Sequence, residues 1–130
     1  MNERQEPIAL IADDDPAIRD FLGTLLRLEG LFLNVAVAAD RDNAMSLALE
    51  HKPRLILMDY TMPGLAAEQF VVRVRSELPA SVVVLMTSAH FVEQKAGELG
   101  LKHYLSKPFD VCMLRELLRA CVRNGAVPAA

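Results

Sequence analysis

The chain has 130 residues, of which 52% are hydrophobic and 24% charged, with a formal net charge of −3 at pH 7. That length and apolar content suit one compact domain with a buried core. The small negative net charge provides no basic surface for nucleic acid, and no apolar run approaches the ~20 residues of a membrane span. Residues 1–7 are polar and lack the apolar core of a secretion signal, so we expect a cytoplasmic protein.

Apolar runs and amphipathic stretches alternate five times along the chain. The runs predict strands over residues 8–12, 31–37, 55–58, 82–86 and 103–106. The first, third and fourth are continuously apolar, as expected of strands covered on both faces, whereas the second is mixed and is expected near an edge. The fifth is short and more polar.

The stretches between the runs predict helices. The first has Asp15 as its N-cap and Pro16 at its first position, and it stops at Gly30. Spacing at i, i+3, i+4 and i+7 predicts an inward face made by Ile18, Phe21, Leu22 and Leu25. Further helices are predicted over 41–50, 66–78, 93–99 and 110–124. The helix at 93–99 is the shortest, and its length and order stay open.

This alternation predicts an α/β fold in which a doubly wound parallel sheet has helices on both faces and right-handed crossovers. Five strands suit the flavodoxin-like (βα)5 arrangement with strand order 2-1-3-4-5, which places the first and third strands side by side. We expect one domain over residues 8–124, an N-terminal extension over 1–7, and a tail or linker stub over 125–130.

The two cysteines, Cys112 and Cys121, belong to the last predicted helix. Their spacing places them on opposite faces and ~13 Å apart along the axis. Because a disulfide needs Cα atoms within ~7 Å, we expect both thiols to be reduced, which agrees with a cytoplasmic location.

Polar side chains follow four of the predicted strands. Asp13 and Asp14 follow the first, Asp59 the third, Thr87 the fourth and Lys107 the fifth. In open α/β sheets, ligands bind outside the carboxyl ends of the strands, where the strand order reverses. The three acids are therefore expected side by side. Since two unit charges ~4 Å apart repel by ~4 kcal/mol at an effective dielectric near 20, such a cluster must take up protons or a cation.

Hard oxygen ligands favour Mg²⁺, and the lack of histidine and cysteine in the cluster argues against zinc. With a dication bound, Asp59 is the best candidate for a nucleophile that attacks phosphorus and forms an acyl phosphate. Lys107 can then supply positive charge, and Thr87 a hydroxyl, to the phosphoryl oxygens.

Four segments carry a family resemblance: LIADDD at 10–15, MDYTMPG at 58–64, TSA at 87–89 and YLSKPF at 104–109. Each is common alone, but the four in this order at strand ends are highly specific. Together they resemble a response-regulator receiver domain of two-component signalling, over roughly residues 8–123.

The resemblance implies that Asp59 is the phospho-acceptor and takes its phosphoryl group from the phosphohistidine of a sensor histidine kinase or a phosphotransfer protein. It also implies that Mg²⁺ is bound by Asp14, Asp59 and the backbone carbonyl of Thr61, with Asp13 acting mainly through water. The chain would catalyse only its own phosphorylation and dephosphorylation, and would be a switch rather than an enzyme.

The resemblance further implies that Lys107 pairs with the phosphoryl group and that the Lys107-Pro108 peptide is cis. Thr87 and Tyr104 would reorient on phosphorylation and alter the surface of the fourth helix, fifth strand and fifth helix. That surface would control binding to an unknown downstream protein or output domain, and it admits a phosphorylation-dependent homodimer. No direct contact with nucleic acid or membrane is expected.

Three other functions stay open. A phosphorylation-independent interaction module on the same fold would bind its partner equally well after Asp59→Asn. A phosphatase with an aspartyl-phosphate intermediate usually has a second acid two residues after the nucleophile, where this chain has Thr61. A flavin-binding flavodoxin is the weakest alternative, because carboxylates after the first strand would repel the phosphate of the cofactor.

Overall fold

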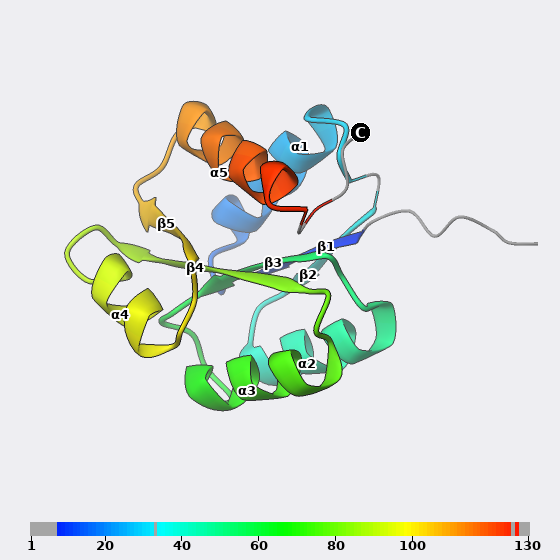
Figure 1. Ribbon diagram of the computed structural model, residues 1–130, viewed down its shortest axis with the longest axis vertical. Helices are drawn as coiled ribbons and strands as arrows, with labels where there is room; N and C mark the ends of the chain where they lie inside the picture. Colours follow the sequence, from blue (N-terminus) through cyan, green and yellow to red (C-terminus); the bar gives the residue numbers. More distant parts are fainter. Residues whose placement is uncertain (1–7, 33, 126, 128–130) are drawn as a thin grey trace, which may run out of the picture.

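The computed structural model describes residues 8–32, 34–125 and 127. Five parallel strands form one sheet in the order β2-β1-β3-β4-β5 (Figure 1). They are β1 (Ile8–Ala12), β2 (Asn34–Ala38), β3 (Leu55–Asp59), β4 (Val82–Ser88) and β5 (His103–Lys107). The predicted fold class and strand order are confirmed, and β2 lies at an edge as expected. β2 begins later than the apolar pattern suggested, at Asn34, and β4 continues to Ser88.

Five helices cover the two faces of the sheet (Figure 1). Two of them, α1 (Pro16–Leu28) and α5 (Val111–Arg123), pack on one face. The other face carries α2 (Arg41–His51), α3 (Ala67–Glu77) and α4 (Val92–Glu98). Because both faces are covered, every residue of the central strand β3 is buried. This burial is why the three central runs are apolar without alternation.

The inward face of α1 differs from the prediction at Phe21. Leu22 and Leu26 are fully buried, whereas Phe21 is 42% exposed and its ring lies 6.0 Å from that of Phe109. The inward stripe is thus rotated by about one residue, toward Leu22 and Leu26. Periodicity identifies an apolar side of a helix, but the sheet beneath decides which residue lies at its centre.

Carboxylate caps start two helices close to the strand ends. The Asp15 side chain accepts a hydrogen bond from the Ala17 amide at 2.9 Å, and Asp110 accepts one from the Met113 amide at 2.9 Å. Each cap satisfies an otherwise unpaired amide of the first turn. As predicted, α1 and α5 therefore begin within a few residues of the acid pair and of Lys107.

The core on the side of the last helix, α5, includes a residue that follows the helix. The buried residues of α5 are Leu114, Leu117, Leu118 and Cys121. Cys121 is buried and Cys112 is exposed, and both are free thiols. Beyond the helix, Val127 is also buried in this part of the core, and its amide donates to the Cys121 carbonyl at 3.2 Å.

Within the part of the chain that the structure describes, no helix is long and apolar enough to cross a membrane.

Candidate functional site

Three carboxylates meet at the carboxyl edge of the sheet. Strands β1 and β3 pair in parallel with Ala12 opposite Met58, so the residues that follow lie next to each other. The carboxylate oxygens of Asp13, Asp14 and Asp59 can be chosen so that all lie within 4.8 Å of one another. Asp13 and Asp59 are buried, whereas Asp14 is exposed. The predicted acid cluster is therefore present, and it opens to solvent on the side of Asp14.

Lys107 reaches the same cluster from the end of β5. Its Nζ lies 2.7 Å from Oδ2 of Asp13 and 3.4 Å from Oδ1 of Asp59. Burial alone would lower the pKa of Lys107, but the hydrogen bond to Asp13 and the charge of Asp59 raise it above its usual value. The ammonium group is therefore charged at neutral pH. The Lys107-Pro108 peptide that follows is cis, as the resemblance implied.

The Asp59 carboxyl is the group whose charge this environment disfavours. Burial raises its pKa above the ordinary value, and the charge of Asp13 adds to the rise. The Lys107 ammonium and the Thr61 amide, which donates to Asp59 Oδ1 at 3.4 Å, act in the opposite direction. The upward shift remains, so one ammonium group does not fully compensate the cluster.

The Asp13 side of the cluster is fixed by the start of α1. Oδ1 of Asp13 accepts from the Asp15 amide at 2.9 Å, and the Asp13 carbonyl accepts from Nη1 of Arg19 at 2.8 Å. With one oxygen taken by an amide and the other by Lys107, Asp13 is held in a defined orientation. The open oxygens belong mainly to Asp14 and Asp59. This set of hard oxygen donors with excess negative charge fits a divalent cation such as Mg²⁺.

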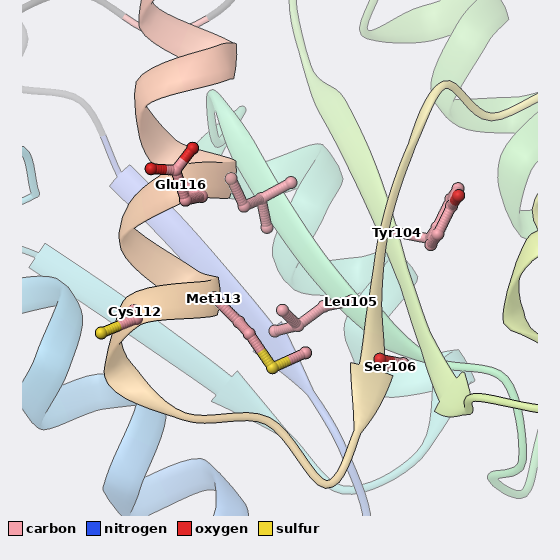
Figure 2. Close-up of a pocket in the computed structure, with 7 residues that line it drawn as sticks. Tyr104, Leu105, Ser106, Cys112, Met113 and Glu116 are labelled. Atoms are coloured by element: carbon pink, nitrogen blue, oxygen red, sulfur yellow. The ribbon is translucent and has the colours of Figure 1, made fainter.

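The two predicted switch residues lie at different depths. Thr87 follows Met86, which pairs with Asp59 across β3 and β4, and it is half-buried at the same edge of the sheet. Tyr104 on β5 is 40% exposed. Figure 2 shows its ring on the side of β5 away from α5, while Leu105 points toward Met113. Tyr104, Leu105 and Met113 are among the residues that line a pocket of about 490 Å³ between β5 and α5.

A buried arginine, Arg41, also belongs to the site although the sequence reasoning missed it. Arg41 is the first residue of α2 and only 3% exposed, and its guanidinium donates to the main-chain carbonyls of Asp59 and Tyr60 at 2.9 and 2.8 Å. The available signal was its spacing, because Arg41 lies three and seven residues before the inward-facing Ala44 and Ala48. A charged residue in register with a buried stripe indicates a specific polar partner.

Comparison with known proteins shows the family to which the chain belongs. The family model described as the response regulator receiver domain matches residues 9–119 of the chain. The chain therefore belongs to the response-regulator receiver domains of two-component systems.

Relatives of known sequence are longer than this chain. The probable transcriptional regulatory protein TcrX of Mycobacterium tuberculosis is 30% identical over 125 residues, which cover 95% of this chain and 53% of TcrX. The DNA-binding dual master transcriptional regulator RpaA of Synechocystis is 35% identical over 122 residues, covering 91% of this chain and 50% of RpaA. The chain thus spans about half the length of the curated relatives it matches.

Solved structures match over almost their whole length. The receiver domain of AraT from Geobacillus stearothermophilus has a TM-score of 0.81 at 28% identity, covering 92% of this chain and 95% of that one. The chemotaxis response regulator CheY4 of Vibrio cholerae has a TM-score of 0.77 at 26% identity, covering 89% and 98%.

Proposed function

We propose that the chain is a phosphoryl-accepting switch in which Asp59 is phosphorylated by the phosphohistidine of a sensor histidine kinase or a phosphotransfer protein, in a reaction that requires Mg²⁺. One observation carries the proposal: three carboxylates and the Lys107 ammonium converge on one point at the carboxyl edge of the sheet. The proposal concerns this domain and leaves the activity of any longer protein aside.

In the proposed reaction, an Asp59 carboxylate oxygen forms a bond to phosphorus as the bond from phosphorus to the donor nitrogen breaks. Lys107 is already charged and 3.4 Å from the attacking carboxylate, so it is placed to bind a phosphoryl oxygen. The Thr87 hydroxyl, near Asp59 on the next strand, can donate to another. The tight hydrogen bond of Lys107 with Asp13 would keep the ammonium over the site during transfer.

We propose the cation ligands to be Asp14, Asp59 and the backbone carbonyl of Thr61, with Asp13 acting mainly through water. The hydrogen bonds of Asp13 support a water-mediated role for this residue. Both of its carboxylate oxygens already accept a hydrogen bond, one from the Asp15 amide and one from Lys107. Bound Mg²⁺ would supply the charge that offsets the mutual repulsion of the carboxylates and of the incoming phosphoryl group.

Phosphorylation would be transmitted through Thr87 and Tyr104 to the surface formed by α4, β5 and α5. The exposed ring of Tyr104 supplies a side chain on β5 that can turn inward. The downstream protein or output domain would bind the surface in one of its two states.

Incubation with acetyl phosphate and Mg²⁺, followed by intact-mass measurement, tests the proposal. Wild type should gain one phosphoryl group, and Asp59→Asn or wild type with excess chelator should gain none. No gain in wild type, or equal gain in Asp59→Asn, would refute the proposal. Partner binding that Asp59→Asn leaves unchanged would then indicate the phosphorylation-independent interaction module.

A further inference from the structure

The loop between β3 and α3, residues 60–66, is bound to the first turn of α2 by hydrogen bonds from one residue, Arg41. Arg41 donates from Nη2 to the carbonyls of Asp59 and Tyr60, and from Nη1 to the carbonyl of Leu65 at 2.7 Å. Its own amide donates to the Pro63 carbonyl at 2.8 Å. One arginine therefore contacts four carbonyl groups of the strand end and loop that contain Asp59.

The burial of this guanidinium is unfavourable in itself. Arg41 is almost fully buried, desolvation lowers its pKa, and its Nε has no hydrogen-bond acceptor among the described residues. A buried donor without an acceptor destabilises the fold, and an apolar side chain of similar size avoids that cost. The arginine is therefore poorly explained as core packing. Its planar fork is suited to bind several carbonyls at once.

The loop itself is shaped to lie against α2. Gly64 has a φ of +101°, and a Cβ at this position would lie 2.8 Å from Oδ2 and 3.0 Å from the amide of Asp42. A side chain would therefore push the loop away from the first turn of the helix. Thr61 lies between Tyr60 and Pro63, whose carbonyls Arg41 holds, so these contacts restrict the position of the Thr61 carbonyl.

We infer that Arg41 is a positioning residue for the cation site: by holding the loop and the end of β3 against α2, it places the Thr61 carbonyl and the Asp59 carboxylate where a divalent cation can bind both. Arg41 itself does not touch the cation or the phosphoryl group. The inference rests on the proposed function, because it deepens the cation site of that proposal.

The charge of Arg41 and its contacts with the loop predict opposite changes in Mg²⁺ affinity when Arg41 is removed. The guanidinium is a positive charge close enough to Asp59 for the two to interact. If charge alone mattered, Arg41→Ala would make the cluster more negative and tighten the binding of Mg²⁺. If Arg41 positions the loop, the same variant weakens binding, because removing a residue that orients a metal ligand typically costs 10–100-fold in affinity.

The test is the dissociation constant of Mg²⁺ alone, measured by titration calorimetry on wild type, Arg41→Ala and Arg41→Lys. We expect weakening of about 10–100-fold in Arg41→Ala and a smaller but clear weakening in Arg41→Lys, which keeps the charge but lacks the fork. Unchanged or tighter binding in Arg41→Ala would overturn the inference. If Arg41→Ala fails to fold, Arg41→Lys decides, and wild-type affinity in that variant overturns it.

Arg75→Ala is the matched control. Arg75 also binds main-chain carbonyls, those of Leu99 and Gly100. These residues precede the amino end of β5, whereas the cation site lies at the carboxyl ends of the strands. The Arg75→Ala variant should be less stable than wild type but should bind Mg²⁺ with unchanged affinity. A loss of Mg²⁺ affinity as large as in Arg41→Ala would contradict a specific role of Arg41. Gly64→Ala keeps Arg41 but moves the loop, and should also weaken Mg²⁺ binding. Wild type that does not bind Mg²⁺ at all would instead refute the proposed function.

Discussion

The Asp59 carboxyl links the chemistry of the site to the stability of the fold. Its pKa is raised in the folded chain, first by burial and then by the charge of Asp13. A carboxyl whose folded pKa lies above its unfolded value binds more protons in the folded state. Its contribution to stability is therefore fully present at pH below the ordinary value of 3.8 and is lost as pH rises through the raised pKa. At neutral pH, the charge of Asp59 favours unfolding.

Asp59→Asn should therefore stabilise the metal-free protein at neutral pH. We expect a gain of about 1 kcal/mol, since the substitution removes a buried charge that Asp13 repels, although the contact of that charge with Lys107 is lost as well. The gain should appear as pH rises from 3.8 through the raised pKa of Asp59, and it should be absent at lower pH.

Urea unfolding from pH 3.5 to 8 measures this difference. Glu50→Gln serves as a control because Glu50 is exposed and lies in the last turn of α2, whereas the first residue of that helix contacts the site. Saturating Mg²⁺ should reverse the order, because the cation binds only the folded wild-type cluster and stabilises it. An Asp59→Asn variant that is less stable than metal-free wild type at pH 7 would contradict the electrostatic account.

At the scale of elements, α4 is the least supported helix of the fold. It has seven residues, and its N-cap residue Phe91 makes no side-chain cap hydrogen bond. Isolated helices of this length are unstable, so external contacts must hold it. Arg75 of α3 binds the Leu99 and Gly100 carbonyls at its end, and Lys95 lies 5.4 Å from the centre of the Tyr60 ring. The second contact joins α4 to the residue that follows Asp59.

Removing Arg75 should loosen α4 more than the rest of the fold. In Arg75→Ala, amide hydrogen exchange should accelerate across α4 and change little in α5, with a global loss of about 1 kcal/mol for the removed hydrogen bonds. Arg73→Ala is the control, because Arg73 makes an exposed pair with Glu77 on the same helix. Equal acceleration in α4 and α5 would mean that α4 unfolds only with the whole molecule.

At the scale of the whole molecule, the core extends beyond the last helix. Val127 is 1% exposed and belongs to the same core cluster as Cys121 and Phe32, on the face of the sheet that α1 and α5 cover. Our expected domain, residues 8–124, was drawn from the end of the helical pattern. The packing of Val127 leads us to propose that the folded unit extends to include this residue.

Val127→Ala should therefore destabilise the domain although it lies outside every helix and strand. Removing two buried methyl-sized groups should cost about 1.5 kcal/mol, at ~0.8 kcal/mol per group. Leu28→Ala is the matched control, because Leu28 is 74% exposed and its truncation should have almost no effect. Thermal or urea unfolding compares the two variants, and similar stability in both would show that Val127 contributes nothing to the core.

The sequence by itself determined the elements, their order and the residues of the acid cluster. Strand and helix patterns are local, because burial on both faces gives apolar runs and helix caps act within one turn. The rule that crossover connections are right-handed then leaves few topologies. The predicted strand order, 2-1-3-4-5, places Asp13 beside Asp59 at the carboxyl ends of neighbouring strands. Strand ends, unlike helix faces, leave little freedom in where the next side chain lies.

Only the tertiary structure decided which partners the polar and aromatic side chains have. The pattern of α1 predicted Phe21 to be inward, but the packing of the sheet buries Leu22 and Leu26 instead. In the sequence, Arg41 does not differ from other charged residues. In the structure, α2 lies beside the end of β3, and the Arg41 guanidinium donates to carbonyls of the loop after Asp59. Such contacts join residues far apart in the chain, and their free energy depends on a geometry that no local pattern encodes.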